Sequence, residues 1–256
     1  MPDMTSYKEG EFCWVELATN DQPGAKSFYS SMFGWKPNDN PMGPDAFYTM
    51  LELKGKNAGA LFNDTTLAQQ GVPPHWNIYI AVKDIDASAK KAVSLGGRML
   101  MEPFDVMEHG RMAVVQDPDG AIFAMWQAKQ HIGMGIRDEM NAFCWWEVSV
   151  NDVEKTKAFY TSLFGWTTKD SPEYTEWQLD GKSIGGCMKI QAEWGPMPPH
   201  WTACVMVSDV DAIDKTANEL GGKTLVPPMD IPGTGRYSIF ADPQGAALAV
   251  YAQQQK

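Results

Sequence analysis

A tryptophan and a glutamate two residues apart occur twice in this chain, in similar surroundings. The stretch FCWVELATND contains Trp14 and Glu16, and the later stretch FCWWEVSVND contains Trp145 and Glu147. A carboxylate desolvated beside an indole can have a raised pKa and act as a general base, or it can anchor a cationic or hydroxyl-bearing ligand. A carboxylate can also ligate a metal ion. The structural alternative is a strand glutamate that pairs with Lys or Arg or bonds backbone donors.

Two histidines repeat in the same way. The tetrapeptide PPHW occurs at 73–76 and again at 198–201, so His75 and His200 occupy equivalent positions. Imidazole in a pocket can bind a ligand or a metal ion. A histidine that follows two prolines at the start of a strand can also bond a backbone group and order the turn. The sequence supports both roles equally.

Two arginines follow a glycine shortly before the end of each half of the chain. They are Arg111 and Arg236. Arginine here could clamp an anionic substrate through its planar guanidinium group. We favour a loop ion pair instead, with Asp117 and Asp242 as the candidate partners.

The cysteines and the common nucleotide and hydrolase motifs exclude several classes. The four cysteines show no CxxC spacing, which indicates neither a zinc knuckle nor a disulfide framework. Cys13 and Cys144 fall on the strand face opposite Trp14 and Trp145, so we expect them to pack beneath the helices and not to act as nucleophiles. The sequence contains no GxSxG, GxxxxGK[ST] or GxGxxG motif, which leaves serine-hydrolase and nucleotide-binding functions without support.

The net charge of the chain argues against some classes of binding partner. A formal net charge of −11 argues against nucleic acid and against an anionic membrane surface, both of which attract clustered Lys and Arg. The N-terminal residues are polar and no apolar run has the length of a membrane span. Together with the cysteine pattern, this predicts a cytoplasmic protein whose partner is a small molecule.

An internal duplication organises the whole chain. Five landmarks recur in constant order, namely the Trp-x-Glu strand, PPHW, LGG, GR and DPDG or DPQG. A repeat of this length predicts two tandem domains, which we place at 1–130 and 131–256.

Each copy contains the pattern β-α-β-β-β twice. The residues FCWVELAT alternate as a strand does, and the following helix is bounded by Asp21 as the N-cap and Gly34 as the terminating glycine. The same order of a strand, a capped helix and three strands follows PPHW. The chain is therefore predicted to contain four modules, at about 10–64, 74–128, 141–191 and 199–253.

These motifs resemble the vicinal oxygen chelate superfamily, which includes glyoxalase I, extradiol dioxygenases, fosfomycin-resistance enzymes and bleomycin-resistance proteins. The residues that carry the resemblance are FY…FGW after the first strand, the mid-domain LGG, and the closing GR…DPDG. They are most similar to those of bacterial tandem-domain glyoxalase-like proteins, over almost the whole chain.

The resemblance implies an α+β fold of two tandem glyoxalase-like domains. In each, two βαβββ modules form curved mixed sheets around an open cup that holds a ligand or a divalent metal ion. It leaves open whether module one pairs with module two or with module four. Because the two halves can pack as an internal pseudo-dimer, the resemblance allows either a monomer or a homodimer.

Metal-dependent members of the superfamily place a His, a second His or similar residue, and a Glu at three positions. In this sequence those positions fall on Trp14, Asn77 and Ala124, and in the second half on Trp145, Thr202 and Ala249. An indole N–H cannot ligate a metal ion and alanine has no donor, so we expect no cofactor. A divalent metal ion held by Glu16 with His75, or by Glu147 with His200, is the alternative, although two donors fall short of the usual three.

We therefore predict a mostly aromatic cup with few polar anchors, which is the usual composition of a ligand site. Phe12 is also expected in its apolar wall. The candidate ligand-binding residues are Trp14, Glu16, His75, Asn77, Tyr79, Trp126, Trp145, Glu147, His200, Thr202 and Tyr251.

Three functions remain open at this point. The first is a glyoxalase- or bleomycin-resistance-like protein that lacks the usual metal site and binds a small hydrophobic or aromatic molecule. The second is a metal-dependent enzyme of the same superfamily, a lyase similar to lactoylglutathione lyase or a dioxygenase, in which Glu16 and Glu147 are the candidate catalytic bases. The third is a structural or interaction protein whose cups are filled by side chains. We favour the first.

Overall fold

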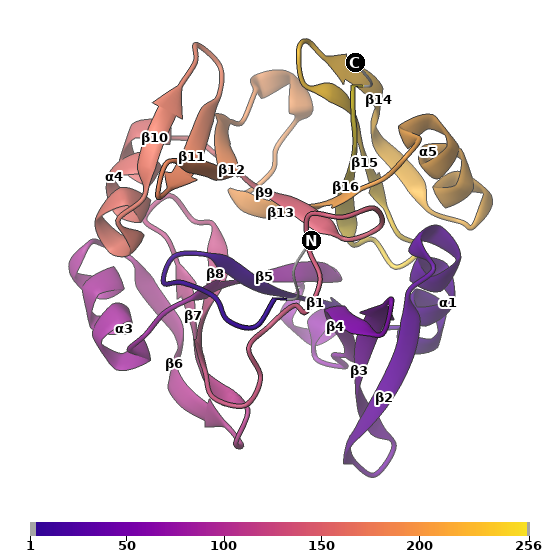
Figure 1. Cartoon of the computed structure of the whole chain (residues 1–256), viewed down its shortest axis with the longest axis horizontal. Coiled ribbons are helices and arrows are strands. Elements are labelled where there is room, and N and C mark those ends of the chain that lie inside the picture. The colour runs from indigo at the N-terminus through magenta and orange to yellow at the C-terminus, as the bar shows by residue number, and fades with distance from the viewer. Residues whose placement is uncertain (1–3, 255–256) are drawn as a thin grey trace.

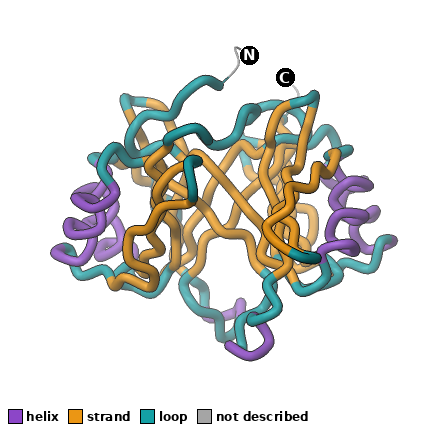
Figure 2. The backbone as a smooth tube through the Cα atoms, turned by 90° about the horizontal axis from the view of Figure 1, so that it is seen from below, coloured by secondary structure: helices purple, strands orange, loops and turns teal. Residues whose placement is uncertain are grey.

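The computed structural model describes residues 4–254, and within them the strands form two open, mixed sheets of eight strands, one from each half of the chain. The strand order is β2-β3-β4-β1-β5-β8-β7-β6 in the first sheet and β10-β11-β12-β9-β13-β16-β15-β14 in the second. Each sheet curves, and the helices lie on the outer flanks of the molecule with the strands between them (Figures 1 and 2).

The elements of the first half are β1 (Phe12–Thr19), α1 (Gln22–Phe33), β2 (Lys36–Gly43), β3 (Ala46–Leu53), β4 (Lys56–Asn63), α2 (Leu67–Gln70), β5 (His75–Ala81), α3 (Ile85–Ser94), β6 (Arg98–Val106), β7 (Gly110–Gln116) and β8 (Ile122–Ala128). Those of the second half are β9 (Phe143–Val150), α4 (Val153–Phe164), β10 (Thr167–Asp170), β11 (Thr175–Leu179), β12 (Lys182–Lys189), a 3-10 turn (Ala192–Trp194), β13 (His200–Met206), α5 (Val210–Glu219), β14 (Lys223–Ile231), β15 (Gly235–Ala241) and β16 (Ala247–Gln253). The predicted βαβββ order is therefore present four times.

The pairing of modules, which the sequence left open, is visible at the centre of each sheet. Strand β1 pairs antiparallel with β5, and β9 pairs antiparallel with β13. Module one thus shares a sheet with module two, and module three with module four. The register places Glu16 opposite Asn77, and Glu147 opposite Thr202.

The first helix of each half begins and ends as the sequence predicts. The Asp21 side chain accepts a hydrogen bond from the Gly24 N–H, and Gly34 ends α1 with φ 71°. Asp152 and Gly165 do the same for α4, where Gly165 also has φ 71°. A side chain with a Cβ would be strained in this left-handed conformation, which is why glycine ends both helices.

The helices of one half pack against the other half. Helix α1 lies beside α5, and α3 lies beside α4 (Figure 1). The Tyr29 hydroxyl of α1 donates to Asp242 Oδ2 at 2.9 Å, and the Tyr160 hydroxyl of α4 donates to Asp117 Oδ2 at 3.1 Å. The tryptophans of the two PPHW motifs donate to the same tyrosines. The two tyrosine–aspartate bonds therefore join the halves, and each tryptophan holds its tyrosine from within the same half.

A β-bulge at the start of each Trp-x-Glu strand changes which face the first residues occupy. The register of β1 shifts between Phe12 and Trp14, and Phe12 stacks on Trp146 of the other half, with centroids 4.8 Å apart and an interplanar angle of 6°. The prediction that Phe12 contributes to the wall of the first cup is therefore wrong. An uninterrupted alternation was assumed, and the bulge interrupts it.

The same bulge in β9 moves Cys144. Its sulfur lies 3.6 Å from the carbonyl oxygen of Cys204, and it is close enough to Tyr251 to affect that hydroxyl electrostatically. Cys144 is half-buried, whereas its counterpart Cys13 is buried. Cys13 makes the equivalent contact with the Tyr79 carbonyl oxygen at 3.6 Å.

No helix within residues 4–254 is both long enough and apolar enough to cross a membrane.

Candidate ligand-binding cups

The cup-facing residues of the first sheet form a chain of hydrogen bonds that ends on Glu16. We call Trp14, Glu16, Tyr48, Tyr79 and Trp126 the N-terminal cup. The Trp14 Nε1–H donates to the Tyr48 hydroxyl at 2.9 Å, and that hydroxyl donates to Glu16 Oε2 at 2.6 Å. The Tyr79 hydroxyl donates to Glu16 Oε1 at 2.5 Å. Both carboxylate oxygens are therefore bonded within the protein.

The N-terminal cup is nearly sealed from solvent. Trp14 is 3% exposed, Glu16 9%, Tyr79 4% and Trp126 6%. Burial raises the pKa of Glu16, while the hydrogen bonds from the two tyrosines oppose that rise. Burial and the nearby carboxylate raise the pKa values of Tyr48 and Tyr79 well above the usual range, so both hydroxyls remain protonated donors.

The linker that follows β8 closes this cup. The His131 ring meets the Trp14 ring edge-on, with centroids 4.5 Å apart, and the Trp126 Nε1–H donates to the His131 carbonyl oxygen at 2.9 Å. The Met134 N–H donates to the Cys13 carbonyl oxygen at 2.8 Å, so the linker is hydrogen-bonded to β1. Burial lowers the pKa of His131 to about 4, and its Nε2 is a buried atom without a hydrogen-bond partner.

Glycine allows this close approach of the linker. Gly133 has φ 117°, and a Cβ at this position would lie 2.2 Å from the Cys13 carbonyl oxygen. Sequence reasoning missed the role of His131 because the linker has no periodic pattern. Gly133 and Gly135, close behind the histidine, were the available signal that the chain passes close to another backbone here.

The second sheet repeats only part of this network. We call Trp145, Glu147, Tyr174, Tyr237 and Tyr251 the C-terminal cup. The Trp145 Nε1–H donates to the Tyr174 hydroxyl at 2.8 Å, and that hydroxyl donates to Glu147 Oε2 at 2.8 Å. All five side chains are half-buried. Among the described residues, none donates a hydrogen bond to Glu147 Oε1.

One exchanged pair of residues explains the difference. The position of Tyr79 in the first half is taken by Cys204 in the second, which faces Trp145 across the β9–β13 pair. The position of Met112 is taken by Tyr237, whose hydroxyl pKa is raised by burial and by the charge of Glu147. Tyr237 is therefore close to the carboxylate, although no hydrogen bond joins them among the described contacts.

Glu147 differs from Glu16 in its protonation as well. Burial raises the pKa of Glu147 to about 7, and the hydrogen bond from Tyr174 opposes the rise. At neutral pH the carboxyl group is therefore present in both forms. It can accept a hydrogen bond as a carboxylate or donate one as an acid.

The remaining predicted cup residues lie at the ends and centre of the same strands. The rings of His75 and His200 each place Nδ1 2.9 Å from a proline carbonyl oxygen, of Pro73 and Pro198 respectively. This is the turn-ordering contact that the sequence allowed for both histidines. Asn77 is half-buried opposite Glu16, and Thr202 is buried opposite Glu147.

The residues at the superfamily's metal positions do not fit a metal centre. Tyr79 pairs with Ala124 and Cys204 pairs with Ala249, so alanine occupies the position of the carboxylate ligand in both sheets. Glu16 already accepts hydrogen bonds at both oxygens. Within residues 4–254, no three His, Cys, Asp or Glu side chains are grouped so that they could hold a metal ion.

The two arginines form ion pairs outside the cups. Arg111 lies 3.1 Å from Asp86 and 3.1 Å from Asp105, and Arg236 makes equivalent pairs with Asp211 and Asp230. The prediction that Asp117 and Asp242 are the partners is wrong. These two buried carboxylates instead accept backbone N–H groups of their own turns and the tyrosine hydroxyls of the opposite half.

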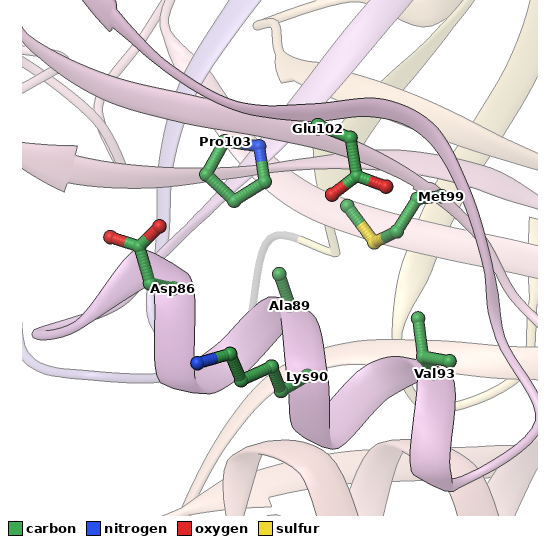
Figure 3. A pocket seen from close by; sticks show the side chains of 7 residues that line it. All are labelled: Asp86, Ala89, Lys90, Val93, Met99, Glu102 and Pro103. Atoms are coloured by element: carbon green, nitrogen blue, oxygen red, sulfur yellow. The ribbon is translucent and has the colours of Figure 1, made fainter.

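A surface pocket of about 280 Å³ lies between α3 and β6, away from both cups. Asp86, Ala89 and Lys90 of α3 line one side of it, and Met99 and Glu102 of β6 line the other (Figure 3). None of the repeated motif residues lines this pocket.

The fold and the paired cups agree with the comparisons to known proteins. The chain belongs to the glyoxalase/bleomycin resistance protein/dioxygenase superfamily, whose family model matches residues 12–125 and 142–250. The resemblance found in the sequence is thereby confirmed, as is the α+β fold with two tandem domains.

Two relatives cover nearly the full chain. CFP32 of Mycobacterium tuberculosis (strain CDC 1551 / Oshkosh), whose name assigns it provisionally to the glyoxylases, is 37% identical over 98% of this chain and 97% of its own. The anthracycline biosynthesis protein DnrV of Streptomyces peucetius is 30% identical over 96% of this chain and 94% of its own.

Solved structures share the fold at low sequence identity. The Mn(II)-bound glyoxalase from Novosphingobium aromaticivorans has a TM-score of 0.67 at 16% identity and covers 97% of this chain and 83% of its own. The 2,3-dioxygenase LapB from Pseudomonas sp. KL28 has a TM-score of 0.66 at 11% identity and covers 97% of this chain and 94% of its own.

Proposed function

We propose that this protein binds a small hydrophobic or aromatic molecule in a sheet cup, without a metal ion. The observation that carries the proposal is the Trp–Tyr–Glu chain of hydrogen bonds at the position where metal-dependent relatives hold their ion. An indole wall beside a single oriented carboxylate has the composition of a ligand site, with few polar groups among apolar ones.

The similarity to DnrV supports an aromatic ligand, because the name of that protein places it in anthracycline biosynthesis and anthracyclines are polycyclic aromatic molecules. We further propose that the protein works in the reducing cytoplasm, as a monomer with an internal pseudo-dimer or as a homodimer. Its four cysteines, all within the described residues, are free.

Thermal-shift measurements with a panel of small aromatic molecules, in the presence of a chelator, test the proposal. A ligand present at 100 times its dissociation constant stabilises the folded state by about 2.7 kcal/mol, so binding is expected to raise the melting temperature by several degrees. No shift with any aromatic would contradict the proposal and favour filled cups with a structural role.

Elemental analysis of the purified protein tests the absence of a metal ion from the site. We expect less than stoichiometric Ni, Zn, Fe and Mn. A stoichiometric metal ion that is lost in Glu16→Gln, together with turnover, would favour the metal-dependent lyase or dioxygenase.

A further inference from the structure

The two cups differ in how many oxygen atoms of their glutamate accept a hydrogen bond from the protein. In the N-terminal cup, the Tyr79 hydroxyl donates to Glu16 Oε1 at 2.5 Å and the Tyr48 hydroxyl donates to Oε2 at 2.6 Å. In the C-terminal cup, the Tyr174 hydroxyl donates to Glu147 Oε2 at 2.8 Å, and none of the described residues donates to Oε1. A second hydrogen-bond donor would stabilise this half-buried carboxylate, since hydrogen bonds to charged groups contribute about 1.5–3 kcal/mol.

Access differs in the same direction. Four residues of the N-terminal cup are less than a tenth exposed, and the linker residue His131 packs edge-on against Trp14. Trp145, Glu147 and Tyr251 are each partly exposed to solvent. Within residues 4–254, the linker after β8 thus packs against the N-terminal cup, and the residues of the C-terminal cup are more exposed to solvent.

From these two differences we propose that the chain binds one ligand, in the C-terminal cup, and that this ligand presents an N–H or O–H group to Glu147 Oε1 from an aromatic body. The proposal rests on the proposed function and names the cup and the ligand chemistry. The ligand's donor takes the role that the Tyr79 hydroxyl has in the other half. Its aromatic body lies among Trp145, Tyr174, Tyr237 and Tyr251.

The nearest hydrogen-bond donors within the protein either bond another acceptor or are weak. The Tyr251 hydroxyl donates to the Thr234 carbonyl oxygen at 2.9 Å. The Cys204 thiol lies beside Cys144 and is a weak donor compared with a hydroxyl. Among the described residues, the hydroxyls of Tyr237 and of Thr202, which lies opposite Glu147, could compete with the ligand's donor.

The donor can be neutral, as in a phenol, or cationic, as in an amine, and pH separates the two. A cationic amine binds the ionised carboxylate, so its affinity falls as pH decreases through about 7, the pKa of Glu147. A neutral phenol loses less affinity over the same range, because a protonated carboxyl group still has an acceptor oxygen.

Isothermal titration with naphthalene, 2-naphthol and 2-naphthylmethylamine tests the proposal, because these probes share one aromatic body and differ in the donor. We expect one site per chain and about tenfold tighter binding of a donor-bearing probe than of naphthalene. Glu147→Gln should remove that preference for the amine and weaken it for 2-naphthol, because the amide keeps one neutral acceptor oxygen. The matched Glu16→Gln should leave the preference unchanged.

Cys204→Tyr supplies the missing hydroxyl in the C-terminal cup and is expected to abolish binding. Circular dichroism confirms that each variant is folded. Two sites per chain, a preference for the amine that Glu147→Gln leaves unchanged, or binding that survives Cys204→Tyr would overturn this inference and leave ligand binding itself intact. If none of the three probes binds the wild-type protein, the proposed function fails as well.

Discussion

The N-terminal and C-terminal cups share one motif on equivalent strands, but within residues 4–254 the first is the more deeply buried. Trp14 and Trp145 both donate to a tyrosine that bonds the neighbouring glutamate. Beyond that shared chain, the first cup gains a second tyrosine donor and a covering histidine, while the second has Cys204 at the same place. The comparison teaches that a duplicated motif preserves the framework of a site. A few side chains and a linker then determine how accessible each copy of the site is.

The largest expected effect comes from forcing the linker away from the N-terminal cup. Gly133→Ala would place a Cβ 2.2 Å from the Cys13 carbonyl oxygen at a φ of 117°, so we expect the free energy of unfolding to fall by about 3 kcal/mol. Urea denaturation measures it. Gly55→Ala is the matched control, because Gly55 has φ 74° with no atom within 4 Å of the added Cβ, and only about 1 kcal/mol of strain is expected. Equal losses of unfolding free energy in the two variants would mean that the linker does not pack closely against β1.

The covering histidine should make the N-terminal cup sensitive to acid. The pKa of His131 is lowered to about 4 in the folded protein, below its ordinary value of 6.5. The unfolded chain therefore binds a proton first, and the stability due to neutral His131 is lost as pH falls from about 6.5 to 4. His131→Gln should remove roughly 2 kcal/mol of this loss of stability over the window, after allowance for the partial solvent contact of the ring. An unchanged slope would contradict the burial of this ring.

Glu147 should give the C-terminal cup the opposite response. Its folded pKa of about 7 exceeds the ordinary glutamate value of 4.5, so the folded state holds the proton more tightly than the unfolded chain does. Its contribution to stability is thus full below about 4.5 and is lost as pH rises to about 7. Relative to Glu147→Gln, the wild type should lose roughly 1–2 kcal/mol over this window, after allowance for solvent contact. Carbon-13 NMR of labelled glutamate measures the pKa directly, and a Glu147 signal that titrates near 4.5 would disprove the desolvation.

The smallest expected difference concerns the two indole N–H groups. Trp14→Phe and Trp145→Phe each remove one hydrogen bond to a tyrosine. The loss should be about 1 kcal/mol larger for Trp14, because its partner Tyr48 and the nearby His131 ring are then left in a sealed site that water cannot readily enter. Chemical denaturation of both variants tests this, and a larger loss for Trp145→Phe would reverse the assignment of the closed cup.

Much of the framework followed from local patterns. The alternation in β1, the caps at Asp21 and Gly34 and the repeated landmarks are signals that depend on neighbours in sequence, so they predicted the strands, the helices and the tandem organisation. The aspartates of the DPxG turns could not be assigned their partners in this way. Tyr29 and Tyr160 reach them from the opposite half, across a large separation in sequence.

The polar part of the site was only partly predictable. Glu16 and Glu147 were identified from the repeat, but their tyrosine partners Tyr48 and Tyr174 were missed. The signal was the dipeptide Tyr-Thr, which occurs at equivalent places on β3 and at the start of β11. The face of Phe12 could not be predicted, because a bulge adds a residue to one strand without changing the polarity pattern that reveals the strand.

The reciprocal bonds of Tyr29 with Asp242 and of Tyr160 with Asp117 have a consequence for how the two halves can diverge. The same residue pair is used twice across a pseudo-twofold relation, as at the interface of a symmetric dimer. In a true homodimer, every substitution in one cup would appear in the other. Joining the two halves in one polypeptide removes that restriction. Substitutions can then make one cup rigid without changing the residues of the other, whose specificity can still change.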